Sequence, residues 1–108
     1  MTPLTYEILL ALADGPLHGY GIIKEIESRA GTDAAPSTGA MYLALQRMEG
    51  DGLIEQADAP SGAEDARRRY YQITVVGRDR AELESRRLAD LVKVARAKRL
   101  LGSAVGGS

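Results

Sequence analysis

The 108-residue sequence predicts an α+β fold that is mainly α, with three short helices, a β-hairpin and one long C-terminal helix. Two patterns predict these elements. Apolar residues recur at helical spacing in four segments, and two other segments carry strand-compatible residues on either side of a turn-forming loop. With 44% hydrophobic and 27% charged residues, the composition is that of one small domain, so two independent domains are excluded.

The first two predicted helices are separated by a break at residues 14–16, Asp-Gly-Pro. Thr2 is an N-cap candidate for a helix over residues 4–13, which is apolar almost all round and is therefore expected to be central. The second helix is predicted over residues 17–30. It is amphipathic, and its apolar face consists of Ile22, Ile23, Ile26 and Ala30.

A third helix is predicted to begin at Ser37, whose hydroxyl can accept a hydrogen bond from a free amide of the first turn. Gly52 is expected to terminate it. The residues at core spacing are Met41, Leu45 and Met48, and a different face carries Thr38, Tyr42 and Gln46.

Two strands are predicted over residues 53–58 and 68–75, which together would form a β-hairpin with a long loop. Side chains alternate along a strand, so Tyr70 and Tyr71 are expected on opposite faces of the sheet. We expect one of these rings to pack inward and the other to be free.

The last helix is predicted to start near Gly77, with Thr74 as its cap, and to run to Leu101, before a flexible tail over residues 102–108. Its apolar stripe is wider than one packing seam. The stripe consists of Leu83, Leu88, Leu91, Val92, Val94, Ala95 and Leu101.

Three short helices, a hairpin and one long helix, in this order, are the parts of a winged helix-turn-helix with an appended dimerisation helix. The predicted boundaries are residues 1–76 for the winged helix-turn-helix domain and 77–101 for the dimerisation helix. One small head cannot cover the whole apolar stripe, so a second copy is expected to pack on it and on the first helix. The predicted interface consists of Ile8, Leu12, Leu88, Leu91, Val92 and Ala95.

Charge and residue content exclude several classes of function. The net charge of −1 gives no global basic field, so any contact with nucleic acid must be local. The absence of cysteine excludes a disulfide scaffold, a thiolate zinc site and a cysteine nucleophile. His18 is the single histidine and has no clustered partners for a metal site or a catalytic triad. We expect no enzyme, no metal and no cofactor.

Two other features are interpreted without catalysis or membranes. Glu64 and Asp65 form an acidic pair in the hairpin loop, where solvated charge is the expected role. The chain contains no apolar run of the roughly 20 residues that a membrane span requires. We therefore expect no membrane association and a cytoplasmic location.

Three segments resemble the PadR-like transcriptional regulators: LHGYGI at 17–22, STGAMYLALQRMEGDGLI at 37–54 and RYYQITVVG at 69–77. The resemblance covers about residues 4–101, with a single helix after the wing as in compact members of the family. Leu43 departs from it, since proline is common there. The resemblance implies a homodimeric repressor that binds a roughly palindromic operator and in some cases releases it when a small hydrophobic or aromatic compound binds near the dimer interface.

Candidate DNA-binding residues lie in the second helix, the third helix and the base of the wing. Small residues and hydroxyls at the start of the third helix allow its N-terminal end to approach a phosphate. Glutamine and arginine can form bidentate pairs with base edges, and wing arginines can reach a flanking backbone. The candidates are Tyr20, Lys24, Ser37, Thr38, Ala40, Tyr42, Gln46, Arg47, Arg67 and Arg68.

Regional charge keeps other functions open. The net charge is −3 over residues 1–36, −2 over 37–76 and +4 over 77–108, so we expect modest DNA affinity. The alternatives are a winged-helix adaptor for protein interactions and a small-molecule-binding dimer without a DNA role. Any effector is expected to be apolar or aromatic and to bind between subunits, and without Trp or Phe only tyrosine rings can stack on it.

Overall fold

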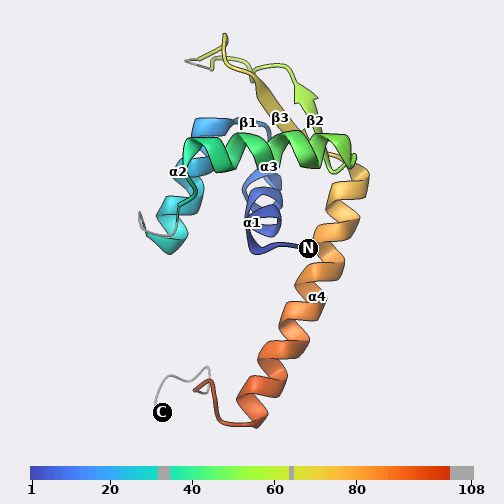
Figure 1. Cartoon of the computed structure of the whole chain (residues 1–108). Coiled ribbons are helices and arrows are strands. Elements are labelled where there is room, and N and C mark those ends of the chain that lie inside the picture. The colour runs from blue at the N-terminus through green and yellow to red at the C-terminus, as the bar shows by residue number, and fades with distance from the viewer. Residues whose placement is uncertain (32–34, 64, 103–108) are drawn as a thin grey trace.

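The computed structural model describes residues 1–31, 35–63 and 65–102. Helices α1, α2 and α3 pack against one another in a head, and a three-stranded antiparallel sheet with the order β1-β3-β2 lies beside them (Figure 1). This is the predicted winged helix-turn-helix, in which the β2–β3 hairpin is the wing. The elements are α1 (Pro3–Leu12), β1 (Leu17–His18), α2 (Gly19–Ala30), α3 (Thr38–Gly50), β2 (Ile54–Ala57), β3 (Tyr70–Ile73) and α4 (Val75–Ala97).

Each helix starts at a side chain that caps its first turn. Thr2, Ser37 and Thr74, the three predicted caps, accept hydrogen bonds from the amides of Thr5, Ala40 and Gly77 at 3.0–3.1 Å. The cap of α2 was not predicted, because it is the ring of His18. Its Nδ1 accepts from the amide of Gly21 at 2.9 Å, so the single histidine has a structural role.

One apolar core joins the head helices to the sheet. Its fully buried members come from α1, α2, α3 and the start of β2: Ile8, Leu9, Leu12, Ile22, Ile26, Met41, Leu45, Met48 and Ile54. The prediction that Ile8 and Leu12 face a second copy of the chain is wrong, because each has 0% exposure inside this core. Helix α1 was predicted to be central, and its own protomer covers the face that carries these two residues.

Strand β1 replaces the predicted first turn of the second helix. Leu17 pairs with Tyr71 and His18 with Tyr70, so the chain adds a third strand to the hairpin before α2 begins. This pairing also changes the expectation for the two tyrosines. Both rings are buried, Tyr71 in the core at 3% exposure and Tyr70 at 6%, where the ring of His18 packs edge-on against it at 5.2 Å.

Helix α4 begins at Val75, two residues earlier than predicted, and ends at Ala97 rather than at Leu101. Its first half packs against α1 and β3, whereas its second half extends away from the head (Figure 1). Leu91, Val92 and Val94 in the extended half are 42–51% exposed. The predicted flexible tail falls on residues that, apart from 102, lie outside the described part of the chain.

Candidate nucleic-acid interface

Helix α3 presents a polar face to solvent. Met41, Leu45 and Met48 fix the opposite face in the core, so the helix cannot rotate without exposing them. Six of the predicted DNA-binding residues lie on or beside the outward face, and all are exposed: Ser37, Thr38, Ala40, Tyr42, Gln46 and Arg47. The small residues cluster at the N-terminal end of α3, where the helix dipole favours an anion.

Tyr42 joins α3 to the start of α2. Its side chain is 48% exposed, and the hydroxyl end of its ring lies close to Gly19, the first residue of α2. A Cβ atom at residue 19 would lie 2.9 Å from the Tyr42 hydroxyl and 3.1 Å from its ring carbon Cζ. A larger residue at position 19 would therefore displace the Tyr42 side chain, and no local pattern in the sequence indicates this contact.

Two predicted cations, Lys24 of α2 and Arg68 of the wing, meet at the ring of Tyr20, a third predicted residue. The ammonium of Lys24 and the guanidinium of Arg68 each lie 5.4 Å from the ring centroid, within the range of a cation–π interaction. The Tyr20 hydroxyl, followed by the Glu27 carboxylate 3.5 Å away, raises the pKa of Lys24. The ring of His18 stacks on Tyr20 at 6.4 Å.

These side chains line an open recess of about 460 Å³, here called the Tyr20 recess. One acidic residue belongs to it. Asp65 Oδ2 lies 2.6 Å from Arg68 Nε, in a turn that a backbone hydrogen bond from Arg68 to the Asp65 carbonyl also closes. The lining residues are His18, Tyr20, Gly21, Lys24, Ala63, Asp65, Arg68 and Tyr70.

Not every basic side chain reaches this surface. Arg29 binds Glu25 at 2.7 Å and Glu7 at 3.0 Å, so it ties α2 to α1 instead of lying ready for an external anion. Arg67 is exposed at the base of the wing, outside the residues that line the Tyr20 recess.

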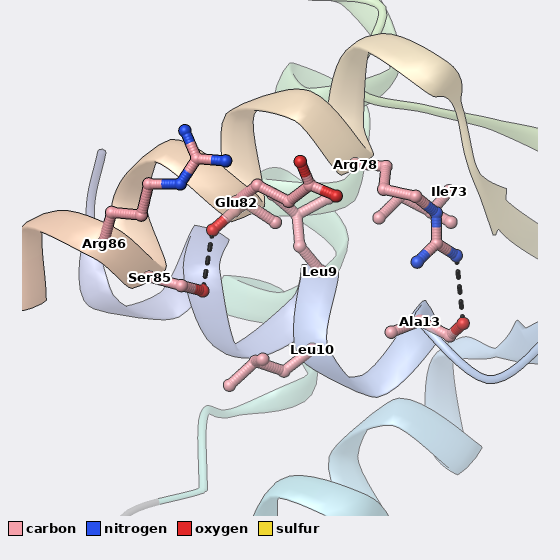
Figure 2. Close-up of a pocket in the computed structure, with 9 residues that line it drawn as sticks. Leu9, Leu10, Ala13, Ile73, Arg78, Glu82, Ser85 and Arg86 are labelled. Carbon is pink, nitrogen blue, oxygen red and sulfur yellow. Dashed lines mark hydrogen bonds between the residues drawn. The ribbon is translucent and has the colours of Figure 1, made fainter. Parts of the chain in front are cut away.

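A second concave site lies between α1 and α4, with a volume of about 360 Å³ (Figure 2). Leu9 and Leu10 of α1 and Ile73 of β3 give it an apolar floor, while charged side chains of α4 form its rim. Arg78 donates to the Ala13 carbonyl at 3.0 Å and so holds the two helices together at one end of this groove.

The described residues contain neither a metal-binding cluster nor a membrane-spanning helix. No group of three or more His, Cys, Asp or Glu side chains in this part of the chain is placed to hold a metal ion. A membrane crossing would need a longer and more apolar helix than any in the same ranges.

Solved structures of similar fold include transcription regulators. A PadR family transcription regulator from Clostridium difficile is 30% identical, with a TM-score of 0.78 over 94% of this chain and 100% of that chain. PadR of Bacillus subtilis, solved in complex with operator DNA, shares the fold, with 23% identity and a TM-score of 0.62 over 75% of this chain and 45% of that one.

In sequence, the chain is 39% identical over 84 residues to an uncharacterized 37.1 kDa protein in transposon TN4556 of Streptomyces fradiae. The match covers 78% of this chain but only 22% of that longer protein. A model of one family matches residues 8–83, which include the second half of α1, the whole of α2 and α3, the wing and the start of α4. The chain belongs to the transcriptional regulator PadR-like family.

Proposed function

We propose that the protein binds double-stranded DNA in a sequence-specific manner as a homodimer and represses transcription. The observation that carries this proposal is the contact of Tyr42 with Gly19. It places the exposed face of α3 next to the residue that precedes Tyr20, so α3 and the Tyr20 recess form one continuous surface. Such a surface can enter a groove and hold the flanking backbone at the same time.

Within this surface the chemistry of the side chains assigns their roles. Gln46 and Arg47 reach furthest along the exposed face of α3 and read base edges in the major groove. Thr38 and Tyr42 donate hydroxyls to phosphates, and Arg67 and Arg68 at the wing base contact the flanking backbone. The fold of Bacillus subtilis PadR, which was solved with operator DNA, supports this mode of binding for the fold.

Helix α4 supports the homodimer. Leu91 and Val92 are 51% and 42% exposed on the half of α4 that extends away from the head, and Ala95 beside them is partly covered. Leu88, also partly covered, lies at the edge of the head, where it lines a hollow with Pro3 and Tyr6 of α1. A two-fold copy would bury this stripe. Two copies of α3 then read successive major grooves only if they are about 34 Å apart, so the operator should be an inverted repeat with centres about ten base pairs apart.

The groove between α1 and α4 supports regulation by a small molecule. Its floor is apolar and its charged rim could anchor one polar group, which is the usual make-up of a ligand site. Arg78, Glu82 and Arg86 on its rim belong to the helix that forms the proposed dimer (Figure 2). An apolar effector in this groove would shift α4 against α1 and change the spacing of the two α3 helices.

Selection of genomic fragments bound by the protein, followed by titration of one selected duplex and a scrambled duplex, tests the function. The proposal requires tighter binding to the selected duplex and a steep loss of affinity with added salt. One observation favours a second candidate, a protein-interaction adaptor: residues 1–76 carry six basic and eleven acidic side chains, a net of −5. Binding to neither duplex would support the adaptor.

A further inference from the structure

The Tyr20 recess contains two cations of the proposed DNA surface, Lys24 and Arg68, and the carboxylate of Asp65, which pairs with Arg68. Lys24 pairs with Glu27 on its own helix at 3.5 Å. Asp65 and Arg68 are joined at 2.6 Å, and their side chains are 48% and 45% exposed. The guanidinium of Arg68 is therefore engaged by an anion of the protein itself. It remains open to solvent on the side from which a larger anion would approach.

We propose that the Tyr20 recess binds one phosphate of the DNA backbone, and that Asp65 is an internal competitor that occupies Arg68 in the DNA-free protein. This inference rests on the proposed DNA-binding function and adds to it a position for one phosphate and a residue that weakens binding. A carboxylate and a phosphodiester each carry one negative charge and accept the same hydrogen bonds from a guanidinium. One can therefore replace the other on Arg68.

The local backbone keeps the competitor in place. The amide of Arg68 donates to the Asp65 carbonyl at 3.1 Å, so the two side chains, three residues apart, leave the same turn. The carboxylate does not have to be brought from a distant part of the chain, and it stays close to Arg68 at little cost in chain entropy. An exposed ion pair of this kind is nevertheless weak, so a phosphate can displace it.

The aromatic ring determines where the phosphate binds. Tyr20 has Lys24 and Arg68 each at 5.4 Å from its centroid, so the ring fixes both cations at one site. When the Asp65 carboxylate moves away, Arg68 can bind an anion in the recess, and the Lys24 ammonium, which pairs with Glu27 at 3.5 Å, lies beside the same ring. The recess, at about 460 Å³, is large enough for a phosphate group with its water.

The experiment compares Asp65→Asn, which keeps the shape of the side chain and removes its charge, with the wild type on the selected and scrambled duplexes. Loss of the competitor should raise affinity about two- to fivefold on both duplexes, the range that an exposed ion pair is worth. It should also steepen the dependence of binding on salt by up to about one unit of slope. The matched control is Asp58→Asn, an exposed wing residue that lines a different hollow with Gln56 and Gln72.

An Arg68→Ala background separates competition at Arg68 from general repulsion of DNA. There, Asp65→Asn should gain no more than Asp58→Asn does. The Nε–H resonance of Arg68 should shift when DNA is added to the wild type, and it should already be shifted in DNA-free Asp65→Asn.

Three results would overturn the inference while leaving DNA binding intact. They are no gain in Asp65→Asn, an equal gain in the Arg68→Ala background, and a loss of affinity in Asp65→Asn. The last would mean that Asp65 holds Arg68 in position for DNA. A wild-type protein that binds neither duplex would instead refute the proposed function, and this inference with it.

Discussion

Replacement of Gly77 by alanine tests how the long helix is attached to the head. Gly77 is the third residue of α4 and is buried, and its amide donates to Thr74 Oγ1 at 3.0 Å. A Cβ atom at this position would overlap the backbone carbonyl of Leu53 and would lie 3.1 Å from Ile73 Cγ1. The same carbonyl accepts a hydrogen bond from the Thr74 amide at 3.1 Å. Because the Leu53 carbonyl is part of the backbone and is hydrogen-bonded, it cannot rotate away as a side chain could. Helix α4 must therefore move instead.

Two effects of opposite sign determine how much Gly77→Ala changes the free energy of unfolding. Alanine favours a helix over glycine by about 1 kcal/mol. Overpacking costs about 1–3 kcal/mol, and a displaced helix also weakens the bond from Thr74 to Leu53, which costs about 1–3 kcal/mol more if its partners are left unpaired. The clash and the lost bond together exceed the gain in propensity. We therefore expect Gly77→Ala to lower the free energy of unfolding by about 1–5 kcal/mol.

Urea unfolding followed by circular dichroism measures this change. Wild type and variant are compared at the same protein concentration, because dimerisation would make the midpoint depend on concentration. The matched control is Gly39→Ala in α3, where a new Cβ has no atom within 4 Å, so a gain of up to about 1 kcal/mol is expected. A Gly77→Ala protein at least as stable as the wild type would refute the close packing of α4 on Leu53.

Three further outcomes are expected. Leu91→Asp should yield a folded monomer with little operator affinity, whereas Ala89→Asp on the same helix should remain dimeric. Sedimentation measures the oligomeric state and gel shifts measure the affinity. A monomeric Leu91→Asp protein with full operator affinity would contradict the prediction. Arg68→Ala should weaken binding to all duplexes and reduce the salt slope by about one, whereas Arg47→Ala should cost about 1–3 kcal/mol mainly on the selected duplex; unchanged binding in both would refute these assignments. The hydrogen bond from Arg87 lowers the pKa of Glu84 from 4.5. The stability difference between wild type and Glu84→Gln should therefore be present above pH 4.5 and disappear as the pH falls through the lowered pKa. Thermal melts in which this difference persists at lower pH would contradict the prediction.

The helix starts could be predicted from the sequence because capping is local. Thr2, Ser37 and Thr74 each bond to an amide only three residues further along the chain. The same reasoning missed His18, since an imidazole is rarely used as a cap and the residue also pairs with β3. A cap that depends on a strand from a distant segment leaves no local pattern.

Features that depend on distant segments were predicted less well. Strand β1 is two residues long, and it exists only because Leu17 and His18 find β3 more than 50 residues later. That pairing places His18 over Tyr70, which explains why both tyrosines of the wing are buried. Helix α1 posed a related problem. When a helix is apolar almost all round, its sequence does not show which face packs in the core and which face contacts a partner. The interface prediction for Ile8 and Leu12 was wrong for this reason.

At the candidate site, the sequence predicted which residues take part but not how they are arranged. The sequence identified Tyr20, Lys24 and Arg68 as separate DNA-binding candidates, but their meeting on one aromatic ring depends on how the wing folds back on α2. Asp65 was interpreted as solvated charge, although its spacing of three residues from Arg68 within a turn-forming segment was a usable sign of an ion pair.

The arrangement of charge limits how the protein can achieve specificity. If Lys24, Arg67 and Arg68 of each protomer contact phosphates, a dimer makes about six such contacts and the salt slope is about −5. With Asp65 competing at Arg68 and a net charge of −5 over residues 1–76, non-specific attraction to DNA is small. Discrimination then depends on the two copies of Gln46 and Arg47, whose pairs with the correct bases contribute about 1–3 kcal/mol each. A regulator built in this way leaves random DNA readily and stays on its operator only while α4 keeps both α3 helices in register.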